Sequence, residues 1–146
     1  MHLSEPKQRQ TPRGRFAWRE GGAPGGKALV MIHGWPESSY CWEHVAAYLK
    51  AGFRIIAPDL RGLGDSERTP DIEHYRKQEM AQDVISLLDQ LGIDEFQLVG
   101  HDWGGIVAQE VALAIPDRVQ RLVIMNIAII NTEALACAIC AICMLP

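Results

Sequence analysis

Short apolar segments constrain the fold of this 146-residue chain more than any other feature of its sequence. Residues 28–33 (ALVMIH) and 53–60 (FRIIAPDL) are apolar runs of the kind that form strands buried on both faces of a parallel sheet. Residues 96–100 (FQLVG) and 119–130 (VQRLVIMNIAII) predict two further strands. The chain therefore supplies a series of buried parallel strands.

Helical patterns separate these strands. Residues 74–90 have apolar positions at helical spacing, and residues 104–115 (GGIVAQEVALAI) predict a helix that stops before Pro116. Residues 39–50 predict a helix whose inner face carries Trp42, Val45, Ala46 and Leu49. Alternating strands and long helices give right-handed crossovers, so the predicted fold class is α/β, a mostly parallel sheet with helices on both faces.

The amino-terminal part looks different from this core. Residues 1–13 are predicted to be a polar arm, and residues 14–20 (GRFAWRE) alternate apolar and polar side chains as in a half-buried edge strand. The expected organisation is one domain over residues 14–130, followed by an atypical tail over residues 131–146 that is rich in Ala and Cys.

Charge and composition exclude several classes of partner. The formal charge is −4 with acids and bases mixed, so there is no basic stripe and no nucleic acid partner is expected. The polar start lacks the apolar core of a secretory signal, which predicts a cytoplasmic protein. Residues 134–146 are apolar, but at about 1.5 Å per residue they cannot cross roughly 30 Å of bilayer, so no membrane partner is expected.

The stretch LVGHDWGG at residues 98–105 carries an aspartate in a glycine-bounded turn between a strand and a helix. A G-x-nucleophile-x-G turn strains its central residue and displays that side chain above the sheet, and Gly100, Asp102 and Gly104 have this spacing. The N–H groups and positive end of the following helix would keep Asp102 ionised. The alternative is an ordinary turn aspartate.

Two other loops are expected beside this turn. Residues 33–37 (HGWPE) and 59–66 (DLRGLGDS) also follow predicted strands, and reactive groups in parallel sheets lie at the carboxyl ends of the strands. All three loops are therefore predicted to open on one rim of the sheet.

These three motifs, in this order, resemble the α/β-hydrolase superfamily and, within it, the branch with an aspartate nucleophile, which contains soluble epoxide hydrolases and haloalkane dehalogenases. The resemblance covers roughly residues 14 to 130. It implies that Asp102 attacks a substrate carbon and forms an alkyl-enzyme ester, which water later hydrolyses. It also implies an oxyanion hole formed by the backbone N–H groups of Trp35 and Trp103, with no cofactor and no metal.

The choice between the two activities depends on the first motif. HGWPES looks more like the epoxide hydrolases, whereas many haloalkane dehalogenases have Asn where this chain has Trp35. Fluoroacetate dehalogenases resemble the pattern too, but usually have Arg at the position of Trp103. The expected substrate is a small apolar epoxide, with a halogenated compound as the alternative. The Trp35–Pro36 bond is expected to be cis, as is common in this family.

The superfamily to which these motifs point has further elements that this sequence lacks. The superfamily has a cap domain, two more strands, an acid and a histidine after the sixth strand, whereas no histidine follows His101 here. The sequence therefore predicts a truncated core lacking the cap and the last strands. A noncatalytic module, or a half-enzyme that needs a second chain, is the alternative, and the unprotected sheet edge would permit self-association.

The remaining polar residues have structural explanations. His33 and His101 are expected to shape loops, His44 and His74 to lie on the surface, and Trp18 and Trp42 to pack. Asp59, Arg61 and Asp65 are expected to build their turn. Cys137, Cys140 and Cys143 have a spacing that could begin a metal site, but a fourth ligand is absent, which favours a chance apolar segment.

Overall fold

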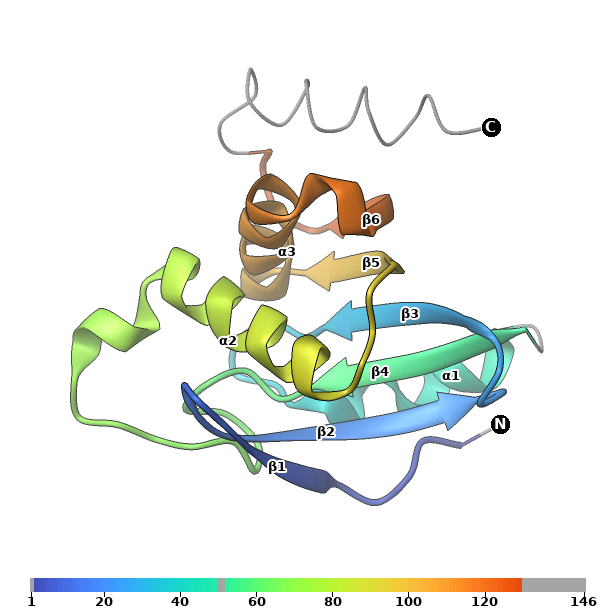
Figure 1. The fold of residues 1–146 in the computed structure, drawn as a ribbon, viewed down its shortest axis with the longest axis horizontal. Coiled ribbons are helices and arrows are strands. Elements are labelled where there is room, and N and C mark those ends of the chain that lie inside the picture. Colours follow the sequence, from blue (N-terminus) through green and yellow to red (C-terminus); the bar gives the residue numbers. More distant parts are fainter. Residues whose placement is uncertain (1, 50–51, 130–146) are drawn as a thin grey trace.

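The computed structural model of the chain describes residues 2–49 and 52–129, and six strands of this part form one sheet in the order β1-β2-β4-β3-β5-β6 (Figure 1). β3, β4, β5 and β6 run parallel to one another, while β2 is antiparallel to both of its neighbours, β1 and β4. The mostly parallel sheet predicted from the sequence is confirmed. The strands are β1 (Lys7–Thr11), β2 (Gly14–Gly22), β3 (Lys27–Ile32), β4 (Phe53–Pro58), β5 (Phe96–His101) and β6 (Val119–Met125).

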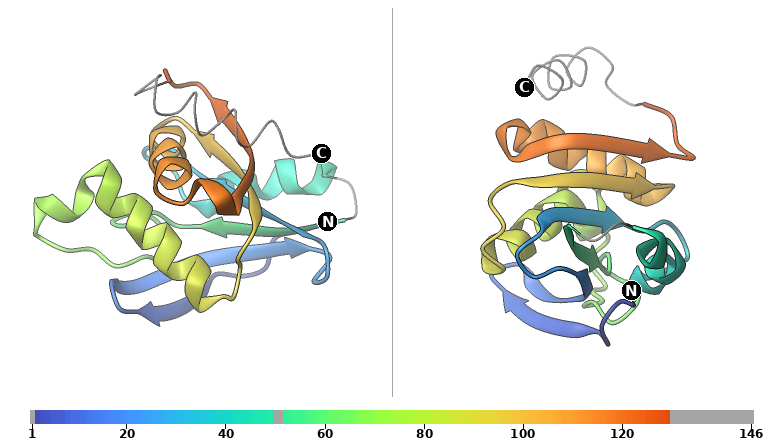
Figure 2. Two further views of the ribbon diagram at one scale, coloured as in Figure 1. Left: turned by 45° about the horizontal axis from the view of Figure 1, so that its top comes forward. Right: turned by 90° about the vertical axis from the view of Figure 1, so that its right-hand side faces the viewer.

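Helices cover both faces of this sheet, as the alternation of elements predicted. α2 (Lys77–Gln90) and α3 (Trp103–Ala114) lie on one face, and α1 (Glu43–Tyr48) lies on the other (Figures 1 and 2). Three short 3₁₀ helices, η1 (Ser39–Trp42), η2 (Ile72–Tyr75) and η3 (Pro116–Arg118), lead into or out of these elements.

The core consists of two apolar clusters, one on each face of the sheet. Val30 and Ile32 of β3 belong to the cluster under α2 and α3, whereas Leu29 and Met31 belong to the cluster with Trp42. Successive side chains of a strand point to opposite faces, so a strand covered on both sides must be apolar at every position. Each fully buried side chain of this kind contributes roughly 1.5–3 kcal/mol.

The prediction that residues 14–20 form an edge strand is wrong. β1 pairs with β2 along its outer side, so β2 is an inner strand and both Phe16 and Trp18 are buried. β1 lies within the predicted polar arm and was missed because four of its five residues are exposed, which leaves no apolar alternation to detect.

The helix predicted over residues 39–50 is shorter and less regular than expected. It begins as the 3₁₀ helix η1, capped by the Ser38 side chain, and continues as α1. A 3₁₀ helix has three residues per turn, whereas an α-helix has 3.6. The residues after η1 therefore do not lie on the faces that a continuous α-helix from residue 39 would give them. Trp42 and Ala46 are buried as expected, whereas Val45 is 42% exposed and does not belong to the inner face.

The carboxyl-terminal strand is also shorter than predicted. β6 ends at Met125, before Asn126, which has a positive φ of 56°. Val123 and Met125 are exposed, whereas Leu122 and Ile124, which point to the opposite face of the sheet, pack against the cluster under α2 and α3. Within the described ranges, no helix is long and apolar enough to span a membrane. The tail with Cys137, Cys140 and Cys143 lies outside the described residues.

Candidate active site

The three loops predicted to share one rim do meet where β3, β4 and β5 end, at the left of Figure 1. The backbone N–H of Leu60 donates to Nε2 of His33 at 3.0 Å, which joins the first two loops. The backbone N–H of Trp35 donates to Oδ1 of Asp102 at 2.9 Å, which joins the first loop to the turn after β5. The Trp35–Pro36 peptide bond is cis, as expected.

Asp102 lies at the sharp turn between β5 and α3 with φ 53° and ψ −125°, a conformation that costs of order 1–3 kcal/mol for a non-glycine residue. The turn is possible because the residues two positions before and after Asp102 are glycines. A Cβ on Gly104 would collide with the carbonyl oxygens of Ile32 and His33, and a Cβ on Gly100 would lie 2.5 Å from the Gly104 oxygen. The glycines of this turn therefore allow Asp102 to adopt a strained backbone conformation, at the rim where the strands end.

Backbone donors surround this carboxylate. The N–H of Trp35 lowers the pKa of Asp102 below its ordinary value, the N–H of Trp103 acts in the same direction, and the charge of His101 adds a smaller effect. These are the two N–H groups that the sequence assigned to an oxyanion hole. In this structure they hold Asp102 ionised, which is the form that can attack carbon.

A pH profile tests this electrostatic arrangement. Because the pKa of Asp102 is lowered, any reaction that needs its ionised carboxylate should keep its rate at neutral and mildly acidic pH, with a midpoint below the ordinary aspartate value of about 3.9. Initial rates of adduct formation over this range, with circular dichroism to confirm that the chain stays folded, measure the effect. A decline centred near neutral pH would show that another group controls the step.

The two histidines at the rim differ in their surroundings. His33 is fully buried, and burial lowers its pKa; its Nδ1 contacts the Gly34 carbonyl at 2.9 Å, so it is a neutral ring that fastens loops. His101 lies 3.4 Å from a carboxylate oxygen of Glu37, which also accepts from the Gly34 N–H. Sequence reasoning did not single out Glu37, although its place in the HGWPE motif was a signal.

The loop after β4 has the structural role that the sequence predicted. The Asp59 carboxylate accepts from the backbone N–H groups of Ser39 at 2.7 Å and Asp65 at 2.9 Å. Arg61 is 2% exposed at its side chain and forms two hydrogen bonds to Asp83 of α2, at 2.7 and 2.9 Å. These contacts fix the loop beside the turn that carries Asp102.

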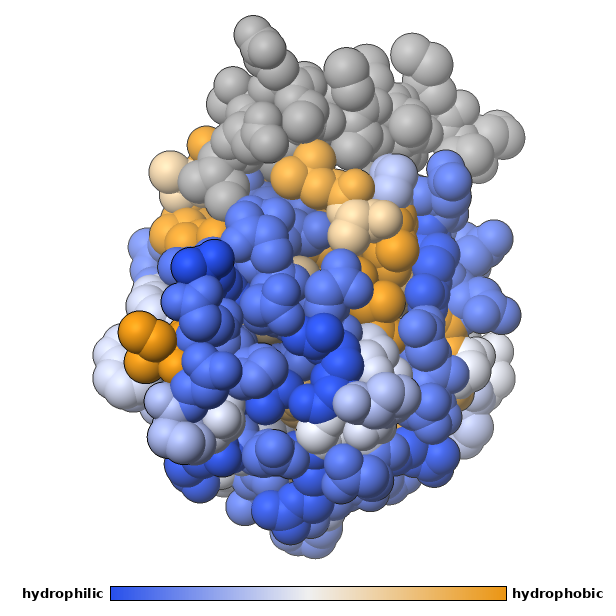
Figure 3. Space-filling model, turned by 60° about the vertical axis from the view of Figure 1, so that its left-hand side comes forward, coloured by the Kyte–Doolittle hydropathy of each residue, from blue (hydrophilic) through white to orange (hydrophobic). Residues whose placement is uncertain are grey.

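An apolar cavity of about 450 Å³ opens beside the Asp102 turn. Figure 3 brings this side of the molecule forward and shows apolar surface gathered over its upper part, near α3 and β6, above a mainly hydrophilic lower part. A cavity of this size and lining suits a small apolar compound. It is lined by Trp35, Arg61, Gly62, Leu63, Arg68, Tyr75, Met80 and Trp103.

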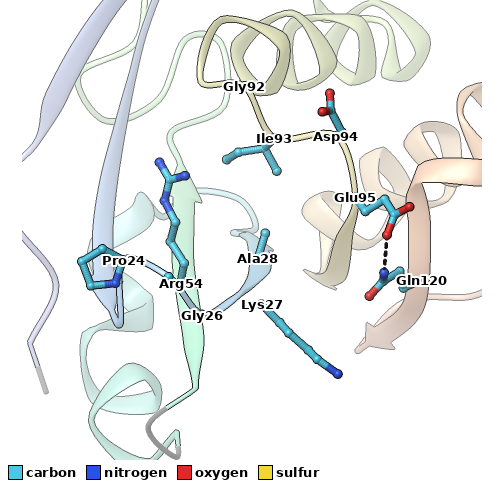
Figure 4. A pocket seen from close by; sticks show the side chains of 11 residues that line it. Pro24, Gly26, Lys27, Ala28, Arg54, Gly92, Ile93, Asp94, Glu95 and Gln120 are labelled. Atoms are coloured by element: carbon cyan, nitrogen blue, oxygen red, sulfur yellow. Dashed lines mark hydrogen bonds between the residues drawn. The ribbon is translucent and has the colours of Figure 1, made fainter.

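A second cavity, of about 430 Å³, lies at the opposite ends of the strands (Figure 4). It is polar, with Lys27, Arg54, Asp94 and Glu95 around it, and Glu95 accepts a hydrogen bond from Gln120 at 2.7 Å. Trp35 and Trp103, whose backbone N–H groups act on Asp102, line the apolar cavity and not this one, so the candidate active site is the apolar cavity.

No group of three or more metal-ligating side chains occurs in the described part of the chain. Cys41 is a half-buried thiol near the rim, and burial together with the charge of Glu37 raises its pKa to about 12. A thiol with this pKa stays protonated at neutral pH and is a poor nucleophile.

Comparison with known proteins agrees with the geometry. The sequence model of the alpha/beta hydrolase fold matches residues 27–136. The chain belongs to the alpha/beta hydrolase fold family. Its resemblance to this superfamily, inferred from the three motifs, is thereby confirmed.

Curated relatives of this hydrolase-fold chain include epoxide hydrolases. It is 47% identical to the soluble epoxide hydrolase of Corynebacterium sp. (strain C12) over 104 residues, which cover 71% of this chain and 36% of that protein. It is 46% identical to epoxide hydrolase 2 of Siraitia grosvenorii over 103 residues, or 70% of this chain and 33% of that protein. The chain thus spans about one third of the length of these relatives.

Solved structures of both activity types have the same fold. A haloalkane dehalogenase from Bradyrhizobium elkani matches with a TM-score of 0.76 and 35% identity, covering 83% of this chain and 41% of that one. An epoxide hydrolase from Vigna radiata matches with a TM-score of 0.78 and 30% identity, covering 88% and 41%.

Proposed function

We propose that this chain carries the nucleophile and oxyanion hole of an epoxide hydrolase-type enzyme. The observation that carries the proposal is the Asp102 carboxylate, held at a strained turn by the N–H of Trp35 beside an apolar cavity. The relatives named epoxide hydrolase support the choice of substrate class.

In the first step, a carboxylate oxygen of Asp102 forms a bond to an epoxide carbon. The carbon–oxygen bond of the ring breaks, and the released alkoxide takes up a proton to leave a hydroxyalkyl ester. In the second step, water adds to the ester carbonyl, and the N–H groups of Trp35 and Trp103 stabilise the oxyanion that forms. Loss of a proton from the attacking water and cleavage of the ester release a diol and regenerate the carboxylate.

Haloalkane dehalogenation is the second candidate. The first step then expels halide from an sp³ carbon, with the same nucleophile. Two observations favour keeping it: the similarity to the dehalogenase of Bradyrhizobium elkani, and the adjacent indoles of Trp35 and Trp103, whose centroids lie 6.4 Å apart. Parallel incubation with styrene oxide and 1-bromobutane distinguishes the two substrate classes by which reagent alkylates the chain.

We predict that the 146-residue polypeptide forms the ester but does not complete sustained turnover. The reason is that water attack needs a proton acceptor: His33 is buried and accepts from the Leu60 N–H, and Nδ1 of His101, the other histidine of the rim, faces Glu37 at 3.4 Å. Incubation with styrene oxide should raise the intact mass of the chain by one epoxide, with less than one diol released per chain. Continued diol formation over many turnovers would contradict this prediction.

The same experiment also separates the noncatalytic alternative. A module without activity would show no adduct with either reagent. If adding a second polypeptide that supplies a histidine restored diol release, the half-enzyme alternative would be supported instead. We propose the outer edge of β6, the last strand in the sheet order of the described residues, as the place where such a polypeptide or a second copy would pair.

A further inference from the structure

The side chain of Trp103 forms one wall of the apolar cavity, and the ammonium group of Lys77 lies over its ring. Nζ of Lys77 lies 4.5 Å from the ring centroid of Trp103. The ring of Trp35, also part of the cavity lining, lies 6.4 Å away and is tilted by 40°. The indole next to the nucleophile is therefore in contact with both an ammonium group and a second aromatic wall.

The place of Lys77 in the chain is unfavourable for its own helix. Lys77 is the first residue of α2, and the preceding Arg76 provides no side-chain cap. The amino-terminal end of a helix carries partial positive charge, so cations there are destabilising and acidic residues are preferred. Residues that break a local rule in this way often serve a functional site.

An ion pair with a carboxylate does not explain the position of Lys77 either. Across residues 2–49 and 52–129, Lys77 forms no ion pair, and the acids nearest to it in sequence are engaged elsewhere. Glu73 pairs with Arg76 at 2.6 Å, and Glu79 pairs with Arg13 at 2.5 Å. The face of Trp103 is the contact that the structure gives to the Lys77 ammonium, at a distance suited to a cation–π interaction.

We infer that Lys77 is a positioning residue that determines substrate specificity by fixing the Trp103 indole as a wall of the apolar cavity. With the indole held, the cavity accepts an aromatic or compact apolar arm of the substrate while Asp102 faces the reacting carbon. Without the cation, the indole is free to adopt other rotamers and to occupy part of the cavity. The effect on substrate rests on the proposed function, whereas the effect on the indole does not.

The structural half of the inference is tested by nuclear magnetic resonance of the indole N–H groups. The chain has four tryptophans, and the signal of Trp103 is the one lost in Trp103→Phe. In Lys77→Met this signal should shift and broaden, whereas Lys77→Arg, which keeps a stacking cation, should retain the wild-type signal. Lys27→Met, which removes an exposed lysine at the opposite end of the sheet, is the matched control and should leave it unchanged.

The functional half is tested with two probes. Toluene should bind the cavity about two- to fivefold more weakly in Lys77→Met than in the wild type, with recovery in Lys77→Arg. The styrene oxide concentration that gives half-maximal alkylation should rise by the same factor, with the maximal rate unchanged. An unshifted Trp103 signal and unchanged toluene affinity in Lys77→Met would overturn the inference. If the wild-type chain binds toluene more tightly than Lys77→Met but forms no adduct, the proposed function fails while the role of Lys77 remains supported.

Discussion

Replacement of Asp102 by asparagine is expected to lower the rate of ester formation by at least about a thousandfold, because the variant lacks the nucleophile. Asparagine has nearly the same shape and is among the residues that tolerate a positive φ, so the turn at φ 53° should persist. Its neutral amide oxygen is a far weaker nucleophile than the carboxylate. The rate is measured as adduct formed per unit time by intact-mass analysis with styrene oxide.

Asp65→Asn is the matched control for this variant. It removes one exposed carboxylate in a neighbouring loop, and the contact that the structure gives this residue to Asp59 uses the Asp65 backbone N–H. Its adduct formation should equal that of the wild type. Adduct formation by Asp102→Asn at the wild-type rate would show that another group attacks the epoxide.

Replacement of Asp83 by asparagine is expected to lower the free energy of unfolding by about 3–5 kcal/mol. The Asp83 side chain is 3% exposed and accepts hydrogen bonds from both Arg61 and Arg13. Removing its charge leaves the buried Arg61 guanidinium, 2% exposed, without its counter-ion. This loss is large because a buried charge without a partner cannot recover its hydration.

Urea unfolding followed by circular dichroism measures this loss. Asp89→Asn serves as the control, since Asp89 is 52% exposed and its pair with Arg118 should contribute less than about 1 kcal/mol. Equal stabilities of the two variants would contradict the assignment of Asp83 and Arg61 as the buried link between α2 and the loop after β4.

Much of the fold followed from the sequence because the strands carry a strong signal. β3 and β4 are apolar at nearly every position, since both faces of the sheet are covered, and this pattern separates them from half-exposed strands. The turn at Asp102 was equally readable, because Gly100 and Gly104 stand where any Cβ would collide with backbone. Steric requirements of this kind leave a fixed spacing in the sequence.

The features that the sequence did not reveal depend on contacts between distant residues. β1 has polar, exposed residues and becomes a strand because β2 offers an unpaired edge. Val45 lies on the exposed side because the 3₁₀ turn of η1 changes the phase of the following helix. The contact of Lys77 with Trp103 joins residues from two helices and has no local signature. Asp83 did leave a signal, as a charged residue on the apolar face of α2.

Peptide mapping of the chain after reaction with styrene oxide tests the central claim most directly. Trypsin releases residues 78–118 as one peptide, which contains Asp102 together with other carboxylates and His101. The proposed function predicts that this peptide gains the mass of one epoxide and that fragmentation places it on Asp102. A modification on Cys41, His101 or another carboxylate, with Asp102 unmodified, would contradict the assignment of Asp102 as the nucleophile.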